Sequence, residues 1–222
     1  MVASSRLCAR RLPTVNMSAP ELPAPGPHPR PPDDIMRRAL PLVERSGPWL
    51  RMHHAASDPV HFGRSGAGRF DAPEHDFGVL YMADDAHGAF IETFGRRTGI
   101  NYVAYDELFQ RRLTQITSSR PLRVVDLTGS GLAQLGADAR LTTGEHRAAQ
   151  AWATVLRAHP QTPDGVLYRA RHDPSRACMA VFDAIRPVLT ARSLGALTDE
   201  AQLELLADII ATYGFGLITS AR

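Results

Sequence analysis

Short apolar runs bounded by glycine, proline or polar residues recur along this chain. Runs of this length and composition are typical of strands buried in a sheet. One of them, Val79-Leu-Tyr-Met-Ala83, follows Gly78 and carries a tyrosine at its centre. The pattern predicts strands over residues 49–52, 79–83, 122–127, 165–168, 178–182 and 215–219.

Helices are predicted where apolar residues recur three and four positions apart. The clearest runs from His146 to His159, with Trp152 and Leu156 on one face. A second, over residues 86–94, is expected to begin near Asp85, whose carboxylate suits an N-cap. Strands interleaved irregularly with helices indicate an α+β fold, a single domain with a mixed or antiparallel sheet and flanking helices. Further helical segments are predicted over residues 33–43, 106–115, 132–135 and 199–213.

Proline dominates the N-terminal part of the chain, at positions 20, 23, 25, 27, 29, 31 and 32. Such a tract cannot pair in a sheet or continue a helix. We therefore expect a disordered Pro-rich tail over residues 1–33, with Met17 as an alternative start. A chain of 222 residues suits one well-buried domain, which we expect over residues 34–222.

Composition restricts the chemistry that is available. All 25 basic residues are arginine, so a Schiff-base lysine and a phosphate-loop lysine are excluded. An anion would have to bind guanidinium or backbone groups. The formal net charge is only +2 with arginine scattered along the chain, which does not indicate direct nucleic-acid binding.

Cys8 and Cys178 are too few for a disulfide framework, so we expect a reducing, cytoplasmic location. No run approaches the roughly 18 apolar residues of a membrane span, so no membrane partner is expected. The histidines do not fall at helical metal-ligand spacing, so no metal site is predicted.

Three passages carry polar groups suited to catalysis, around Arg51, between Arg69 and Glu92, and over residues 164–173. Glu92 lies about two turns into the predicted helix, too deep to cap it, so it is either a surface acid or a site residue. Tyr81 is either a core side chain or a ligand contact. Arg69 is a solvated loop residue, a partner of Asp71 or an anion-binding group. Arg51 either lies at a sheet edge or binds an anion.

In this order the three passages resemble the RES-domain family over residues 49–183, including the linking segments Val125–Gly129 and Leu141–Glu145. The resemblance implies an ADP-ribosyltransferase-like fold and a RES-like catalytic domain. It also implies a toxin of a bacterial toxin–antitoxin system that consumes NAD⁺ and is neutralised by a helix-turn-helix (Xre-type) antitoxin.

By the same resemblance, Arg51, Arg69, Tyr81 and Glu92 are the catalytic candidates. NAD⁺ is expected to bind Arg51, Arg69, Tyr81, Tyr168, Ala170 and Arg171. Ala170 stands where the family has a serine, and its methyl group cannot replace a hydroxyl as a hydrogen-bond partner. NAD⁺ would be a substrate, with no separate cofactor.

The residue types suit this chemistry. Release of nicotinamide develops an oxocarbenium-like cation on the ribose, which a fixed carboxylate stabilises. Guanidinium groups bind a diphosphate in a bidentate manner.

Three functions are therefore expected as alternatives. The first is an NAD⁺-degrading toxin that uses phosphate or water as acceptor. The second is a protein mono-ADP-ribosyltransferase with the same cleft. The third is a non-catalytic NAD⁺-binding domain that was weakened by Ala170. A homodimer or a hetero-oligomer with the antitoxin is expected as the assembly.

Overall fold

The structure, a computed structural model, describes residues 30–96 and 99–219. Most of the expected Pro-rich tail therefore lies outside the described residues, which include only positions 30–33 of it.

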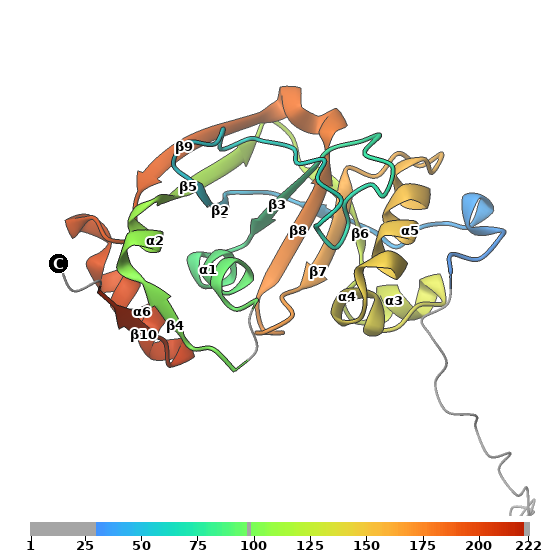
Figure 1. Ribbon diagram of the computed structural model, residues 1–222. Coiled ribbons are helices and arrows are strands. Elements are labelled where there is room, and N and C mark those ends of the chain that lie inside the picture. Colours follow the sequence, from blue (N-terminus) through green and yellow to red (C-terminus); the bar gives the residue numbers. More distant parts are fainter. Residues whose placement is uncertain (1–29, 97–98, 220–222) are drawn as a thin grey trace, which may run out of the picture.

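A curved sheet of eight strands forms the centre of the molecule (Figure 1). Its order is β1-β6-β7-β8-β3-β2-β5-β9, and neighbouring strands are antiparallel except for β6 and β7. The bounds are β1 Leu42–Arg45, β2 Trp49–His54, β3 Val79–Ala83, β5 Arg111–Ser118, β6 Leu122–Asp126, β7 Gly165–Arg169, β8 Ala177–Phe182 and β9 Leu189–Gly195. A separate parallel pair is formed by β4 Tyr102–Ala104 and β10 Gly216–Ile218.

The helices lie on the concave side and at the ends of this sheet (Figure 1). α1 lies within the curve against β2, β3 and β8, whereas α3, α4 and α5 lie beside β6 and β7. Their bounds are α1 Ala86–Phe94, α2 Tyr105–Phe109, α3 Ser130–Leu135, α4 Arg140–Thr143, α5 His146–Arg157 and α6 Leu203–Tyr213. Short 3₁₀ helices cover Ile35–Arg37 (η1), Asp183–Val188 (η2) and Glu200–Gln202 (η3). This arrangement confirms the predicted α+β class, with a single domain built on a mixed sheet.

Alternation along the strands divides the apolar residues between two cores. In β3, Val79 and Ala83 join the core on the α1 side, whereas Leu80 and Met82 join the core on the convex side. Tyr81 packs against the α1-side core, and so does Tyr168 of β7. The period of two in a strand therefore places both tyrosines on the face that α1 covers.

Two predicted helices are wrong. Residues 33–43 form only η1 and then the strand β1, because Pro41 cannot continue a helix and the chain after it pairs with β6. Of residues 106–115, only those up to Phe109 are helical in α2. The following segment alternates as β5 and hydrogen-bonds to β2 and β9, so sheet pairing outweighs the helical spacing.

Several other predicted elements agree closely with the structure. The strands predicted over 49–52, 79–83, 165–168 and 178–182 are confirmed with small extensions, and α1 has the predicted bounds. The 146–159 helix ends at Arg157 and the 199–213 helix divides into η3 and α6. β1, β4, β5, β9 and α4 have no counterpart in the prediction.

Candidate functional site

A cavity of about 370 Å³ opens on the concave face of the sheet, beside α1. This volume lies in the range of small-ligand pockets. Four strands (β2, β3, β7 and β8), three helices (α1, α4 and α5) and three loops contribute to its wall. The lining residues are Leu50, Arg51, Met52, Ala67, Gly68, Arg69, Tyr81, Met82, Ala83, Ala89, Glu92, Thr93, Arg96, Thr142, His146, Tyr168, Arg171, His172 and Cys178.

α1 brings Glu92 to this wall. The helix begins at the N-cap Asp85, whose Oδ1 accepts a hydrogen bond of 2.7 Å from the Gly88 amide. Ala89, Phe90 and Ile91 are buried, and Glu92 on the next position is half-buried. The carboxylate is therefore fixed at the boundary between core and cavity, in keeping with a site residue.

Two groups from the chain around residue 170 orient the Glu92 carboxylate. The backbone N–H of Arg171 donates to Oε1 over 3.1 Å, and the Tyr168 hydroxyl lies 3.4 Å from Oε2. Burial raises the pKa of Tyr168 well above its ordinary value, so its hydroxyl stays protonated as a donor at neutral pH.

Arg51 of β2 lines the cavity from the strand next to β3. Its Nη1 donates to the His61 carbonyl over 3.3 Å, while its buried Nε has no hydrogen-bond partner among the described residues. Burial lowers the pKa of Arg51 to about 10, so the guanidinium remains charged at neutral pH. A half-buried cation that lines the cavity suits an anionic ligand.

Arg69 reaches the same cavity from the loop over residues 64–71. Its Nη1 donates to the Gly144 carbonyl over 2.7 Å, which anchors the side chain to the segment before α5. Burial and the nearby charge of Arg171 lower the pKa of Arg69. Two guanidinium groups that repel each other in this way are stabilised when an anion binds between them.

The Asp71 carboxylate, which is buried, holds the loop over residues 64–71 together. Its Oδ1 accepts from the Tyr81 hydroxyl over 2.8 Å, and its Oδ2 accepts from the Gly68 amide over 2.9 Å and from Ser65 Oγ over 3.1 Å. The Tyr81 oxygen in turn accepts from the Phe70 amide over 2.9 Å. The Tyr81 hydroxyl is thus already bonded twice.

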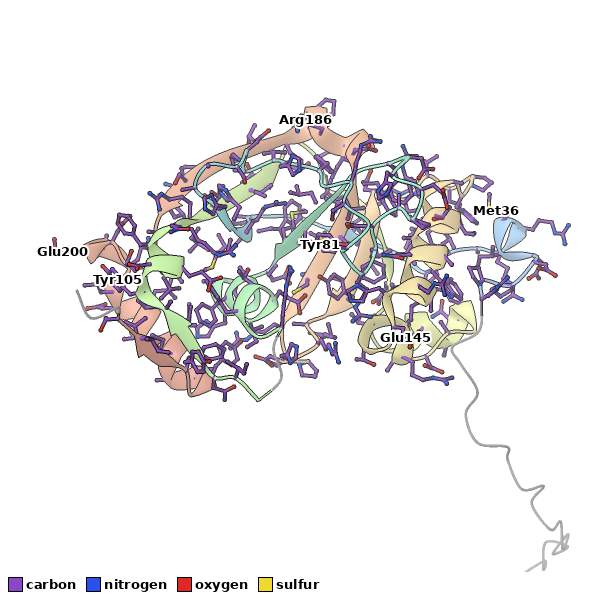
Figure 2. All side chains as sticks on the ribbon, in the orientation of Figure 1. Met36, Tyr81, Tyr105, Glu145, Arg186 and Glu200 are labelled. Atoms are coloured by element: carbon purple, nitrogen blue, oxygen red, sulfur yellow. The ribbon has the colours of Figure 1, made fainter. Side chains whose placement is uncertain are left out.

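Figure 2 shows Tyr81 near the middle of the molecule, consistent with its position on β3. Burial, followed by the charge of Asp71, raises the pKa of Tyr81, so the phenol remains neutral. Its ring lines the cavity while its hydroxyl orients the loop that carries Arg69.

The structure brings most of the predicted residues together and separates one. Arg51, Arg69, Tyr81, Glu92, Tyr168 and Arg171 all line the cavity. Ala170 is not among the lining residues, because the residue is only 1% exposed and belongs to the α1-side core. The groups that orient Glu92 are its neighbours Tyr168 and Arg171.

Several residues of the site were not predicted from the sequence. Arg96, Thr142, His146 and His172 complete the wall, and Asp71 orders the loop behind it. Arg96 lies just beyond the end of α1, four positions after Glu92, and its Nε donates to the Glu92 carbonyl over 3.0 Å, so this spacing is the signal that the sequence offers for it. For the others, no local pattern in the sequence gives a signal.

A model of the RES domain matches residues 48–203, more than half of the chain. The chain belongs to the RES domain family. A relative from Sinorhizobium fredii (strain NBRC 101917 / NGR234), "Probable toxin y4kH", is 31% identical over 98 residues, which are 42% of this chain and 73% of the relative.

A solved structure also has the same fold as this RES domain. A chain in the crystal structure of the M. tuberculosis MbcT–MbcA toxin–antitoxin complex superimposes with a TM-score of 0.58 at 23% identity. The match covers 75% of this chain and 92% of that one.

Two kinds of feature are absent from the described residues. None of the helices in this part of the chain is both long enough and apolar enough to span a membrane. Over the same residues, His, Cys, Asp and Glu side chains form no group of three or more suited to a metal ion.

Proposed function

We propose that this RES-domain protein cleaves the bond between nicotinamide and ribose in NAD⁺ and acts as the toxin of a toxin–antitoxin system. The observation that carries the proposal is a single cavity that is lined by Glu92 together with Arg51, Arg69 and Arg171. NAD⁺ combines a diphosphate, which needs cations, with a ribose that becomes cationic as nicotinamide leaves.

In the proposed reaction each charged group has one task. Arg51, Arg69 and Arg171 bind the diphosphate, and Glu92 stabilises the positive charge that develops on the ribose. When the bond between ribose and nicotinamide breaks, both electrons stay on the nicotinamide nitrogen. Nicotinamide therefore leaves as a neutral molecule. Water then gives ADP-ribose and a proton, whereas phosphate gives a phosphorylated ADP-ribose. NAD⁺ is consumed as a substrate, and no separate cofactor takes part.

The toxin role is supported by the family and by the named relatives, one a probable toxin and the other a toxin–antitoxin complex. We propose an antitoxin of the helix-turn-helix class as the partner and the cytoplasm, where NAD⁺ is abundant, as the site of action.

The test is to incubate the purified protein with NAD⁺, with and without phosphate, and to measure free nicotinamide. We expect Glu92→Gln to lower the rate about 100- to 1,000-fold, because it removes the charge that stabilises the transition state. Glu107→Gln is the matched control, since this exposed acid lies on α2, away from the cavity lining, and we expect a rate like that of the wild type.

The other outcomes separate the alternatives. Nicotinamide release only in the presence of a protein acceptor, with label transferred to that protein, would instead identify a mono-ADP-ribosyltransferase. NAD⁺ binding without release, with activity gained on Ala170→Ser, would identify a non-catalytic domain. An absence of NAD⁺ binding in all conditions would contradict the proposal as a whole.

A further inference from the structure

The loop over residues 170–176 connects β7 to β8 and presents two residues to the cavity, Arg171 and His172. The hairpin closes through a hydrogen bond of 3.0 Å from the Ala170 amide to the Arg176 carbonyl. Because the Arg171 amide also holds Glu92, the position of this loop sets the position of both a cation and the carboxylate.

Asp173 organises the loop from within. Its Oδ1 accepts from the Ser175 amide over 3.0 Å, and its Oδ2 accepts from Arg176 Nε over 3.1 Å and from the Tyr213 hydroxyl over 2.8 Å. Burial alone would raise the pKa of Asp173, but hydrogen bonds from Ser175 and Tyr213 outweigh it and lower the pKa to about 2. The carboxylate is therefore charged throughout the physiological range.

Tyr213 is the last residue of α6, and its ring packs on α1. It is stacked on Phe90 at 6.4 Å between ring centroids and lies 5.9 Å from the His87 ring. The same helix contributes Asp208, whose carboxylate lies 3.1 Å from His87 Nε2. α6 therefore contacts the helix that carries Glu92 as well as the loop that carries Arg171.

A second connection joins the loop to the start of α1. Arg176 Nη1 donates to Asp85 Oδ2 over 2.6 Å, and Asp85 is the N-cap of that helix. Tyr213, Asp173, Arg176 and Asp85 thus form one continuous chain of hydrogen bonds from α6 to α1.

We propose that α6 holds the 170–176 loop against the cavity, with Tyr213 as a positioning residue that acts through Asp173. The RES domain model matches residues 48–203, and all of α6 except its first residue lies beyond that range. The helix that holds the loop therefore lies outside the matched region. The inference rests on the proposed function only for the identity of the ligand, NAD⁺.

Tyr213→Phe tests the proposal, because it removes the hydroxyl and leaves the ring packed on α1. We expect the KM for NAD⁺ to rise about tenfold, because Arg171 binds substrate and the loop loses one charge-assisted hydrogen bond. We also expect kcat to fall about two- to fivefold, because the Arg171 amide holds the Glu92 carboxylate. Tyr102→Phe is the matched control, because Tyr102 is 54% exposed on β4.

Asp173→Asn provides a second variant. If both residues act through one hydrogen bond, the Tyr213→Phe and Asp173→Asn effects on KM will not multiply in the double variant. Independent, multiplying effects would overturn the proposal, as would a KM for Tyr213→Phe equal to that of the Tyr102→Phe control.

Amide hydrogen exchange separates this proposal from the proposed function, because it needs no activity. We expect the amides of Arg171 and Arg176 to exchange about tenfold faster in Tyr213→Phe than in Tyr102→Phe. If the wild type releases no nicotinamide, the proposed function fails and the exchange still decides whether Tyr213 holds the loop. Equal exchange in the two variants would overturn the proposal.

Discussion

Arg51 combines burial with a charge, two properties that oppose each other in a folded protein. Its pKa is lowered to about 10 by burial, and within residues 30–96 and 99–219 its Nε has no hydrogen-bond partner. A cation whose pKa is lower in the folded state than in the unfolded state destabilises the fold at every pH below the folded value. At neutral pH the protein therefore retains Arg51 at the expense of stability, which favours a role in binding.

We predict that Arg51→Met raises the free energy of unfolding by about 1 kcal/mol and the melting temperature by about 2–4 °C. The same change should weaken NAD⁺ binding about tenfold or more, because a charge-assisted contact to the diphosphate is lost. Thermal denaturation at pH 7 and isothermal titration with NAD⁺ measure the two effects.

Arg192→Met is the control, since Arg192 is exposed on β9 and bonds to Gln115. It should change neither quantity. A less stable Arg51→Met protein would mean that the guanidinium is satisfied in the fold and is not held for a ligand.

At the scale of elements, the loop over residues 64–71 shows how an irregular segment becomes rigid. Asp71 bonds to the loop from within, and Tyr81 bonds to it from β3. Gln150 Nε2 of α5 donates to the Gly66 and Gly68 carbonyls over 2.8 and 3.1 Å. A side chain at position 68 would overlap the Asp71 carboxylate and the Tyr81 hydroxyl.

We predict that Gly68→Ala lowers the free energy of unfolding by about 1–3 kcal/mol, because the buried hydrogen bonds must shift to admit a methyl group. The KM for NAD⁺ should rise about tenfold as Arg69 moves with the loop. Denaturant unfolding and steady-state kinetics provide the measurements.

Gly63→Ala is a matched control, because a Cβ there meets only the Val79 carbonyl oxygen at 3.9 Å. We expect this variant to lie within about 0.5 kcal/mol of the wild type. Equal effects of the two substitutions would show that the loop tolerates a side chain at position 68.

Elements with a clear local pattern could be predicted from the sequence. The α1 bounds and the position of Glu92 followed from Asp85 and the apolar spacing, and the two central strands followed from unbroken apolar runs. β5 could not be predicted, because its pairing with β2 and β9 depends on segments distant in the sequence. Asp71 was missed for the same reason, since its bond to Tyr81 forms only when the loop folds over β3.

At the scale of the whole molecule, the cavity exists because the sheet curves around α1. Its lining residues run from Leu50 to Cys178 and come from strands, helices and loops that meet only in the folded chain. Among the lining residues that the structure describes, four are arginines and one is an acid: Arg51, Arg69, Arg96, Arg171 and Glu92. A cavity with this charge attracts anions.

A neutralising antitoxin can exploit the same excess of positive charge. We predict that the partner covers the cavity with an acidic group and competes with NAD⁺.

Glu92→Gln protein suits the test, because we expect it to bind NAD⁺ without consuming it. With NAD⁺ at about 100 times its Kd, the apparent Kd for the antitoxin should rise about 100-fold if binding is mutually exclusive. Arg69→Ala in this background should weaken the binding of both NAD⁺ and the antitoxin. Arg192→Ala, at an exposed position of β9, should weaken the binding of neither. An antitoxin affinity that is independent of NAD⁺ would place the partner on another face of the molecule and would require neutralisation by a conformational change of the site.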